Sequence, residues 1–574
     1  MKCRTLFLAV IVSFALGTKA QDIESVIQAP LLSTNGGIAM NHIFTLTPGD
    51  TTVSHPYAFY LSGNLNFNFL DVVGIPLSFA YTNQQLTKNV SLPFNRFSLA
   101  PSYKWMKVYA GYTSMHFSPY SLAGHELFGG GVELTPDNGL KISAVYGRLK
   151  KQSFGADDTD PSFRRMGGGF SVEYKKEQFD VGVNLFKAQD LLSSEYLAHP
   201  DSLDVLPQDN LSGSIKAGIS FIKNLRLTTE YGISALNRNI NPYGNATGNR
   251  FRMLETEGDL AVFHAVKTQL TYTQPAGSIG ATYEKVDPNY TTMGAYYMTN
   301  DYENMTANFS TVIKKVNIAV NGGYQRDNLS NQKNNTSSRI IYSANVSSNL
   351  TEKLSFAFNL SNLQSYVYIN DIYDRVTQTN EFQNLDTLNV TQLNYTASLN
   401  SSYVLQSAKE QRQSLNLNFM YQKSAEAQQY SRFSGNDIYN TGVSYQLSVL
   451  PLKLTASASV SHNYNRMPED MFTQAMTYNV SLQKTFFENL KSALTATCSR
   501  MSNQEGKLSN VMNIRISEGY VLAQKHNFNL SLTLLHSDNL TKKRLQYAAN
   551  LSYAYNFNIT VSRKDRRLKL DYDF

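Results

Sequence analysis

Residues 354–361 read Leu-Ser-Phe-Ala-Phe-Asn-Leu-Ser, in which large apolar residues alternate with small or polar ones. Successive side chains of a β-strand point to opposite faces. Leu354, Phe356, Phe358 and Leu360 therefore share one face, and the other face carries serine, alanine and asparagine. This segment is predicted to be a strand with one apolar and one polar face.

The same alternation recurs from about Tyr57 to the C-terminal Phe574. The clearest further examples are residues 59–69, 140–146, 393–399, 415–421, 452–460, 476–482, 528–534 and 545–555. A barrel that crosses a membrane needs this pattern along its whole length, because lipid lies outside its wall and water or polar protein lies inside. The sequence therefore predicts an all-β fold, a single large antiparallel transmembrane β-barrel over residues 57–574.

The N-terminus predicts export from the cytoplasm. Basic Lys2 and Arg4 precede an apolar run over residues 6–16, and Thr18-Lys19-Ala20 has the small residues of a cleavage site. The apolar run is too short for a membrane-spanning helix, which needs about 20 residues. Residues 1–20 are therefore predicted to be a cleaved signal peptide.

The C-terminus predicts which membrane the chain enters. Residues 568–574 read Leu-Lys-Leu-Asp-Tyr-Asp-Phe, an amphipathic segment closed by an aromatic residue. This resembles the C-terminal insertion signal of bacterial outer-membrane proteins. We therefore expect the chain in the cell outer membrane, with lipid as its first partner.

Connections between the expected strands alternate between short and long. Short ones include Asp137-Asn138-Gly139 and Pro275-Ala276-Gly277. Long ones are roughly residues 190–211, 236–259, 288–302, 363–388 and 424–437. Outer-membrane barrels have short periplasmic turns and long extracellular loops. An Asn-Gly pair is typical of a tight hairpin whose two turn residues both adopt positive φ.

Strands counted from Tyr57 number about 26, and more than about 20 on any count. With this number the last strand would end outside the cell, which conflicts with the terminal signal. Residues 37–46 as an extra first strand and residues 558–574 as a terminal hairpin would give about 28, an even number as closure requires. Residues 21–56 are otherwise patternless, so this N-terminal segment is expected to be either a first strand or a lumenal or periplasmic plug.

Composition excludes several classes of function. Removing Lys2, Arg4 and Lys19 from the 51 basic residues leaves 48 against 44 acidic residues, a net charge of +4. No basic stripe indicates nucleic-acid binding. Cys3 leaves with the signal peptide, so Cys498 is left without an internal disulfide partner and is expected to face lipid.

The block over residues 94–105, 111–125 and 128–134 combines aromatic, glycine, serine and histidine residues. Over roughly residues 90–150 the chain resembles large Bacteroidota-type outer-membrane barrels, a resemblance that implies the fold and no activity. Glycine runs at 129–131 and 167–169 permit sharp bending or close approach of another backbone. They predict either strand curvature or a wall against which an inserted loop or the N-terminal segment packs.

Catalytic and metal sites have little support in the sequence. Ser114, His116, Ser118, Ser121 and His125 are close in sequence, as a serine hydrolase would need, but nothing shows a base and an orienting group beside a nucleophile. Asp157, Asp158 and Asp160 lack the glycine and glutamate of a calcium loop. We therefore expect no enzyme activity and assign no catalytic, cofactor-binding or metal residue.

The polar faces of the strands consist mainly of Asn, Ser, Thr and Gln, which suits water, sugars or a packed polar plug. A barrel of this size would leak if empty, since barrels of about 16–18 strands already contain an aqueous channel. We expect an outer-membrane conduit or translocon component for a bulky solute, glycan, lipid or polypeptide. Its lumen would be occluded by long loops, by residues 21–56 or by a periplasmic or surface lipoprotein. The alternatives are a non-conducting scaffold or assembly subunit that binds a lipoprotein or another barrel, and more remotely a barrel hydrolase.

Overall fold

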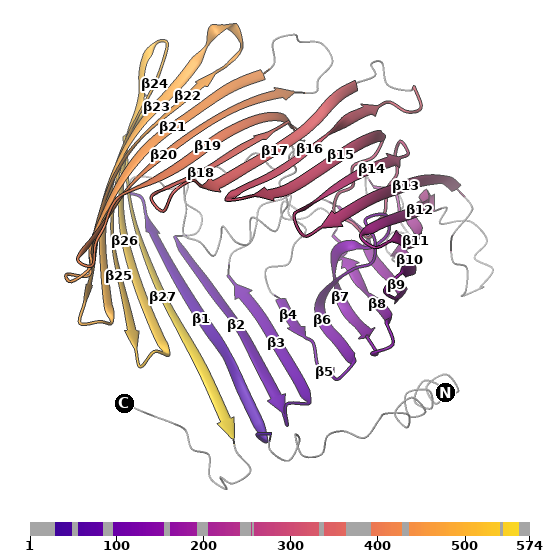
Figure 1. Ribbon diagram of the computed structural model, residues 1–574. Helices are drawn as coiled ribbons and strands as arrows, with labels where there is room; N and C mark the ends of the chain where they lie inside the picture. Colours follow the sequence, from indigo (N-terminus) through magenta and orange to yellow (C-terminus); the bar gives the residue numbers. More distant parts are fainter. Residues whose placement is uncertain are drawn as a thin grey trace.

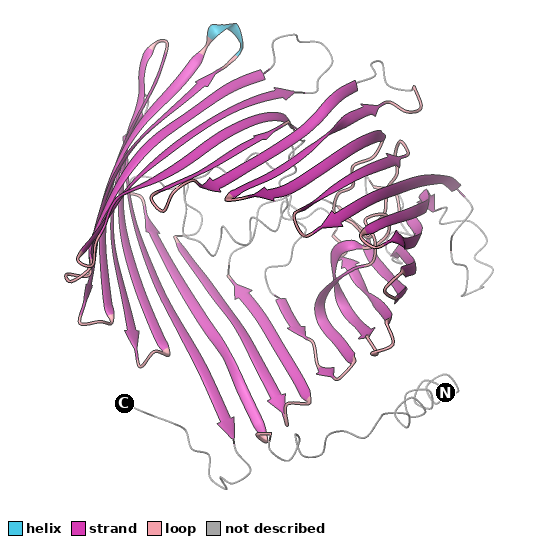
Figure 2. Cartoon of the chain, viewed as in Figure 1, coloured by secondary structure: helices cyan, strands magenta, loops and turns pink. Residues whose placement is uncertain are grey.

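The structure is a computed structural model, and it describes residues 29–48, 56–83, 96–153, 161–191, 205–240, 254, 258–331, 338–362, 392–426, 435–539 and 543–561. These residues form one antiparallel sheet that curves around and closes on itself (Figure 1). A single short 3₁₀ helix, η2 (Pro468–Asp470), interrupts the β-structure of the described residues, as the colouring of Figure 2 shows. No described helix is long and apolar enough to cross a bilayer.

The first half of the sheet contains the shortest strands. Its strands are β1 (Leu32–Leu46), β2 (Tyr57–Phe69), β3 (Val73–Thr82), β4 (Arg96–Leu99), β5 (Ser102–Tyr103), β6 (Met106–His116), β7 (Ala123–Leu134), β8 (Leu140–Lys150), β9 (Arg164–Lys175), β10 (Phe179–Leu191), β11 (Asp209–Ile222), β12 (Leu225–Ile240), β13 (Gly258–Gln274) and β14 (Gly277–Val286). The second half comprises β15 (Tyr302–Ile313), β16 (Val316–Asp327), β17 (Ser338–Asn349), β18 (Leu354–Ser361), β19 (Gln392–Ser407), β20 (Gln411–Glu426), β21 (Gly435–Val449), β22 (Leu454–Arg466), β23 (Phe472–Phe486), β24 (Leu490–Asn503), β25 (Gly506–Leu522), β26 (His526–Asn539) and β27 (Lys543–Val561).

The barrel closes between its first and last strands. β1 pairs with β27 over its whole length, from Leu32 opposite Val561 to Leu46 opposite Tyr547. Its other edge pairs with β2. Of the 27 strand segments, β4 and β5 together occupy one position between β3 and β6, so the barrel has 26 strands. The predicted even-numbered barrel of more than 20 strands is confirmed.

This closure bears on the two additional elements expected from the sequence, an extra first strand and a terminal hairpin. Residues 37–46 do form part of the first strand, which begins at Leu32. Residues 558–561 of the expected terminal hairpin continue β27, with Asn558 opposite Asn35 of β1, and the rest of that hairpin lies outside the described residues. The strand count from Tyr57 was accordingly one too high. The signal peptide, the loop carrying Asp157, Asp158 and Asp160, and the terminal segment 562–574 lie outside the described residues.

The short turns lie at the end of the barrel where β1 begins and β27 ends. Phe69, which precedes the turn between β2 and β3, lies opposite Leu32. The longer connections, such as residues 47–56 between β1 and β2, lie at the opposite end. This is the predicted arrangement of periplasmic turns and extracellular loops.

The Asn-Gly turn is present, but its conformation differs from the expected one. Gly139 has a φ of 84°, whereas Asn138 is not among the residues with positive φ. Instead, the Asn138 side-chain oxygen accepts a hydrogen bond of 3.0 Å from the backbone nitrogen of Leu140. Turns with two positive φ angles occur at Leu70-Asp71, where φ is 53° and 52°. This turn is therefore closed by the side-chain hydrogen bond of Asn138, with positive φ at Gly139 and not at Asn138.

The two faces of the sheet differ as the alternation predicts. In β13 the outward Val262 is 49% exposed, whereas the neighbouring inward Phe263 is 9% exposed. Outward rows of Leu, Val, Ile, Phe and Tyr continue around the barrel, and Cys498 lies exposed in such a row beside Leu494. A closed sheet leaves no unpaired backbone edge, and an apolar exterior is stable only in lipid. The chain is therefore an outer-membrane barrel.

Deleting residues 32–46 is expected to abolish barrel formation, because β27 and β2 would each lose their hydrogen-bonded neighbour. The measurement is the heat-dependent shift in electrophoretic mobility that folded barrels show after reconstitution. Deleting residues 22–28 is the control and should leave the shift intact. A folded species after the loss of residues 32–46 would contradict closure by β1.

Candidate functional site inside the barrel

Buried apolar side chains gather inside one part of the barrel. They lie on the inner face of strands β6 to β14 and on two connections, residues 117–122 and 287–301. We call this set the lumenal core. Its members are Met115, Phe117, Tyr120, Leu122, Leu127, Val145, Phe186, Ala188, Leu236, Phe263, Ala265, Val286, Tyr290 and Met293. Figure 1 shows these strands curling on the side of the barrel opposite β20 to β26.

The connection between β6 and β7 reaches across the curved wall to β12. Tyr120 is 1% exposed, and its side chain lies directly against Gly232. A Cβ atom at Gly232 would lie 2.5 Å from the Cβ of Tyr120. Only a residue without a side chain leaves room for this contact, so Gly232 is a requirement of the packing.

The connection between β14 and β15 also folds inward. It leaves the wall at Val286 and returns at Tyr302, and these two residues lie directly opposite each other in the sheet. The chain between them is an excursion into the lumen, where Tyr290 is 0% exposed. An excursion of this kind adds interior contacts without changing the register of the wall.

The two connections are hydrogen-bonded to each other. The Tyr290 hydroxyl donates to the backbone oxygen of Tyr120 at 2.7 Å, and the Thr292 hydroxyl donates to the backbone oxygen of Ser121 at 2.7 Å. The backbone nitrogen of Ala123 donates to the oxygen of Gly294 at 2.9 Å. Segments far apart in the sequence thus form one folded unit inside the barrel.

Polar side chains of the wall hold this unit in place. Ser118 donates to the Glu230 carboxylate, Ser121 donates to Asn184 at 2.5 Å, and the Tyr120 hydroxyl donates to Glu284 at 2.8 Å. Because these polar groups are removed from water, each needs such a partner. Burial raises the pKa of the Tyr120 phenol well above its usual range, so it remains a donor.

Charges of alternating sign line the wall beside these anchors. Lys216 lies opposite Glu230, Glu230 opposite Lys267, and Lys267 opposite Glu284. The Lys267 amine is 3.2 Å from the Glu284 carboxylate. Each charge has a neighbour of opposite sign, so this row adds no net charge to the lumen.

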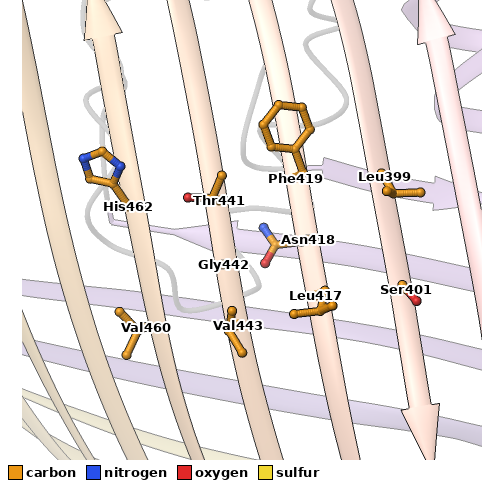
Figure 3. Close-up of a pocket in the computed structure, with 10 residues that line it drawn as sticks. All are labelled: Leu399, Ser401, Leu417, Asn418, Phe419, Thr441, Gly442, Val443, Val460 and His462. Atoms are coloured by element: carbon orange, nitrogen blue, oxygen red, sulfur yellow. The ribbon is translucent and has the colours of Figure 1, made fainter.

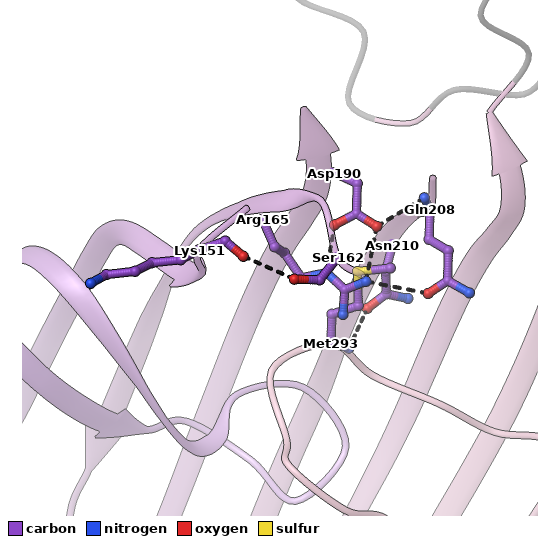
Figure 4. Close-up of polar contacts among 7 residues, drawn as sticks. All are labelled: Lys151, Ser162, Arg165, Asp190, Gln208, Asn210 and Met293. Atoms are coloured by element: carbon purple, nitrogen blue, oxygen red, sulfur yellow. Dashed lines mark hydrogen bonds and ion pairs between the residues drawn. The ribbon is translucent and has the colours of Figure 1, made fainter. Parts of the chain in front are cut away.

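A second polar group lies closer to the long-loop end of the barrel (Figure 4). Arg165 makes hydrogen bonds of 2.8 and 2.9 Å to Asp190 and a longer one of 3.4 Å to Gln208. The backbone nitrogen of Met293 donates to Asn210 at 3.0 Å, which ties the inward connection to β11. Asp190 neutralises Arg165, so this pocket is structural rather than a free cationic site.

The glycine runs lie where neighbouring strands and their side chains approach closely. A Cβ at Gly131 would lie 2.6 Å from Met115, and one at Gly167 would lie 3.0 Å from the Phe186 ring, so both leave space for the lumenal core. A Cβ at Gly129 would instead lie 2.5 Å from the backbone of Gly147 on the next strand. The runs therefore leave space for apolar side chains of neighbouring strands and allow close approach of the next strand.

The serines and histidines of the block do not form a catalytic arrangement among the described residues. Ser118 and Ser121 are buried and bonded to Glu230 and Asn184. His125 stacks on Tyr296 with ring centroids 4.0 Å apart, and so supports the inward connection. No group of acidic, histidine and cysteine residues in the described part of the chain could hold a metal ion.

The wall residues of this unit were missed in the sequence. Glu230, Lys267 and Glu284 lie on three different strands, and only the register brings them together. A signal was present in residues 290–298, Tyr-Thr-Thr-Met-Gly-Ala-Tyr-Tyr-Met, which carry no charge. A solvated extracellular loop rarely has such a composition, so this segment could have been predicted to be buried.

The rest of the inner surface differs from this part. From β15 through β27 and on to β3, inward side chains are mainly Asn, Ser, Thr, Gln, Gly and Ala, and most are half-buried. Neighbouring side chains hydrogen-bond across strands, as between Asn479 and Thr497 at 2.7 Å and between Thr477 and Ser499 at 3.0 Å. We call this surface the neutral wall.

A shallow hollow on the outside of the same strands belongs to the lipid-facing surface. Leu399, Leu417, Val443 and Val460 line it from β19 to β22 (Figure 3). These side chains are exposed on the apolar outer face. Lipid chains fill such irregularities in a membrane, so this hollow carries no separate function.

Comparison with known proteins gives only distant likeness. No protein-family model and no curated protein matches the chain. Among solved structures, a chain of an E. coli P pilus tip assembly intermediate, PapC-PapD-PapK-PapG, is 12% identical with a TM-score of 0.43, covering 94% of this chain and 62% of its own length. The P pilus usher (PapC) translocation pore is 11% identical with a TM-score of 0.38 over 92% of this chain and 99% of that one. The ferric citrate transporter FecA is 11% identical with a TM-score of 0.38, over 92% of this chain and 79% of that one.

Replacing Gly232 by valine is expected to displace Tyr120 and destabilise the barrel by about 1–3 kcal/mol, the usual cost of overpacking. The measurement is urea-induced unfolding in lipid vesicles. Gly322→Val is the matched control, because a Cβ at Gly322 meets nothing within 4 Å. Equal stability of the two variants would contradict the packing of Tyr120 on β12.

Tyr120→Phe is expected to cost about 1–3 kcal/mol, because the buried Glu284 carboxylate loses a donor. The comparison is Tyr283→Phe, which removes a hydroxyl that donates to Glu303 at 2.7 Å on the outer face. Glu303 keeps its hydrogen bond from Arg326, so this half-buried change should cost less than the inner one. The free energy of unfolding of both variants decides whether the inner bond is the stronger anchor.

Proposed function

We propose that this protein is an outer-membrane conduit or translocon component for a bulky polar solute. The observation that carries the proposal is the division of the inner surface into the lumenal core and the neutral wall. The described inward connections fill only the part bounded by β6 to β14. The neutral wall offers uncharged donors and acceptors along the remaining strands.

The chemistry of the neutral wall indicates the class of cargo. Amide and hydroxyl groups exchange hydrogen bonds with water or with hydroxyl-rich solutes at little net cost. Such a surface selects weakly by charge and does not attract apolar molecules. Among the cargoes expected from the sequence, glycans and other polar solutes therefore fit better than lipids.

The barrel is wide enough to need occlusion. Barrels of about 16–18 strands already contain aqueous channels, and those of about 22 strands are plugged. Residues 32–46 belong to the wall, so they are not a plug. We propose that a lipoprotein partner or another segment of this chain covers the neutral wall, and co-purification in mild detergent would identify a partner.

A non-conducting scaffold is the second candidate. The lumenal core favours it, because a packed and hydrogen-bonded interior contributes rigidity rather than a pathway. A stoichiometric partner together with zero conductance would support this candidate.

Hydrolase activity is not part of the proposal. The buried Ser118 and Ser121 hydroxyls already donate to Glu230 and Asn184, which assigns them a structural role. Ser118→Ala, Ser121→Ala and His116→Ala variants should show the same absence of lipid hydrolysis as the parent protein. Hydrolysis lost in any of these variants would overturn this assignment.

Planar-bilayer conductance tests the conduit. Val286 and Tyr302 face each other in the sheet, so an Asn-Gly turn can replace residues 287–301 without altering the wall. This variant is expected to conduct more than the parent protein, because part of the lumenal core is removed. The control is the same turn in place of residues 467–471 between β22 and β23, where Arg466 lies opposite Phe472.

The control variant should conduct like the parent protein. Zero conductance in all three proteins would contradict a conduit and favour the scaffold. Folding of each variant is checked by its heat-dependent electrophoretic shift.

A further inference from the structure

A single cation stands in the middle of the neutral wall. Arg515 lies near the centre of β25, which runs from Gly506 to Leu522, and its side chain shares the inner face with Asn513 and Ser517. The inward partners across the sheet are Thr495 on β24 and Thr533 on β26. All four neighbours are uncharged.

Other charged residues on the inward positions of this wall lie at or next to strand ends. Those whose side chains the structure describes are Asp327, Arg412, Lys491 and Arg544. Within the described strands β15 to β27 and β1 to β3, Arg515 is therefore the one charged inward residue far from both ends of its strand. Arg515 therefore lies far from both ends of the barrel.

Arg515 lacks the acidic partner that neutralises its counterparts elsewhere. On the strands around the lumenal core, Arg165 pairs with Asp190, and Lys267 pairs with Glu284. Arg515 makes one hydrogen bond, from Nε to the Thr533 hydroxyl at 3.4 Å, and no ion pair with the described residues. Its terminal nitrogens remain available as donors toward the lumen.

A guanidinium in this setting is suited to one kind of ligand. Its planar donors match the two oxygens of a carboxylate, phosphate or sulfate group, and charge-assisted hydrogen bonds of this type are stronger than neutral ones. The hydroxyls of Thr495 and Thr533 can add further donors, whereas the Ser517 hydroxyl donates to Ser531. The half-buried position also weakens screening by salt relative to a surface cation.

We propose that Arg515 and these hydroxyls form an oxyanion subsite of the lumen. The subsite takes a carboxylate, phosphate or sulfate group carried by a solute that is otherwise uncharged and polar, such as an acidic glycan. This proposal rests on the proposed conduit and specifies its cargo. The proposal also predicts that the lumen prefers anions to cations. This preference would come from Arg515 and not from the net charge of the chain.

The first test is the ratio of anion to cation permeability from reversal potentials in a salt gradient. Arg515→Gln is expected to lower this ratio about fivefold, the effect of one close charge in a wet environment. The matched control is Arg500→Gln, because Arg500 has the same charge but lies on the outward row of β24 with Leu494 and Cys498. An equal ratio in the parent protein and the Arg515→Gln variant would overturn the subsite while leaving the conduit intact.

The second test does not depend on conduction. In a Cys498→Ser background, Ser517→Cys places a reporter thiol two residues from Arg515 on the same face. The rate of its reaction with an anionic methanethiosulfonate, relative to a cationic one, is measured with and without Arg515→Gln. The ratio is expected to fall about fivefold when Arg515→Gln is added.

An unchanged ratio of reaction rates would overturn the subsite even if no protein conducts. A lowered ratio in a protein without conductance would instead overturn the conduit and retain the subsite. The two failures are thereby distinguishable. Arg500→Gln, combined with the same reporter, should leave the ratio unchanged.

Discussion

Backbone hydrogen bonding in lipid is the constraint on which the rest of this structure depends. No water is present in the hydrocarbon region to satisfy an unpaired strand edge, so the sheet must close. The pairing of β1 with β27 meets this demand over the full length of β1. Closure then fixes which face meets lipid and which encloses the lumen, and the lumenal core and the neutral wall both lie on that second face.

The interior is divided by how the wall curves and by what fills it. Glycines at positions such as 131 and 232 leave space beside the wall, and Met115 and Tyr120 occupy that space. The two inward connections then bury their own apolar residues, as a soluble domain does, while the outward apolar residues stay exposed to lipid. The opposite wall keeps an uncharged polar surface. One chain therefore combines a packed interior with a surface suited to a solute.

The strands were predictable because alternation is local, as Leu354 to Leu360 show. The number of strands was harder to predict. Whether Asn558 continues the preceding strand is decided by its pairing with Asn35 at the closure, and no nearby residue indicates that pairing. The candidate site was less predictable. Gly129 to Gly131 indicated a wall, but Glu230 and Glu284 become neighbours of the Tyr120 loop only through the register of several strands. The position of Arg515 on an inward row is readable from sequence; its lack of an acidic neighbour requires the sheet.

The meeting of the first and last strands also determines the order of assembly. β27 is the last of the described strands in chain order, so β1 must wait for its partner until β27 has been synthesised and exported. During that interval two strand edges remain open, and open edges promote aggregation. Joining segments so distant in the chain also carries a large loop-closure entropy. Insertion should consequently be an all-or-none event governed by the arrival of β27, and a chain that lacks β27 is expected to fail entirely rather than form a smaller ring.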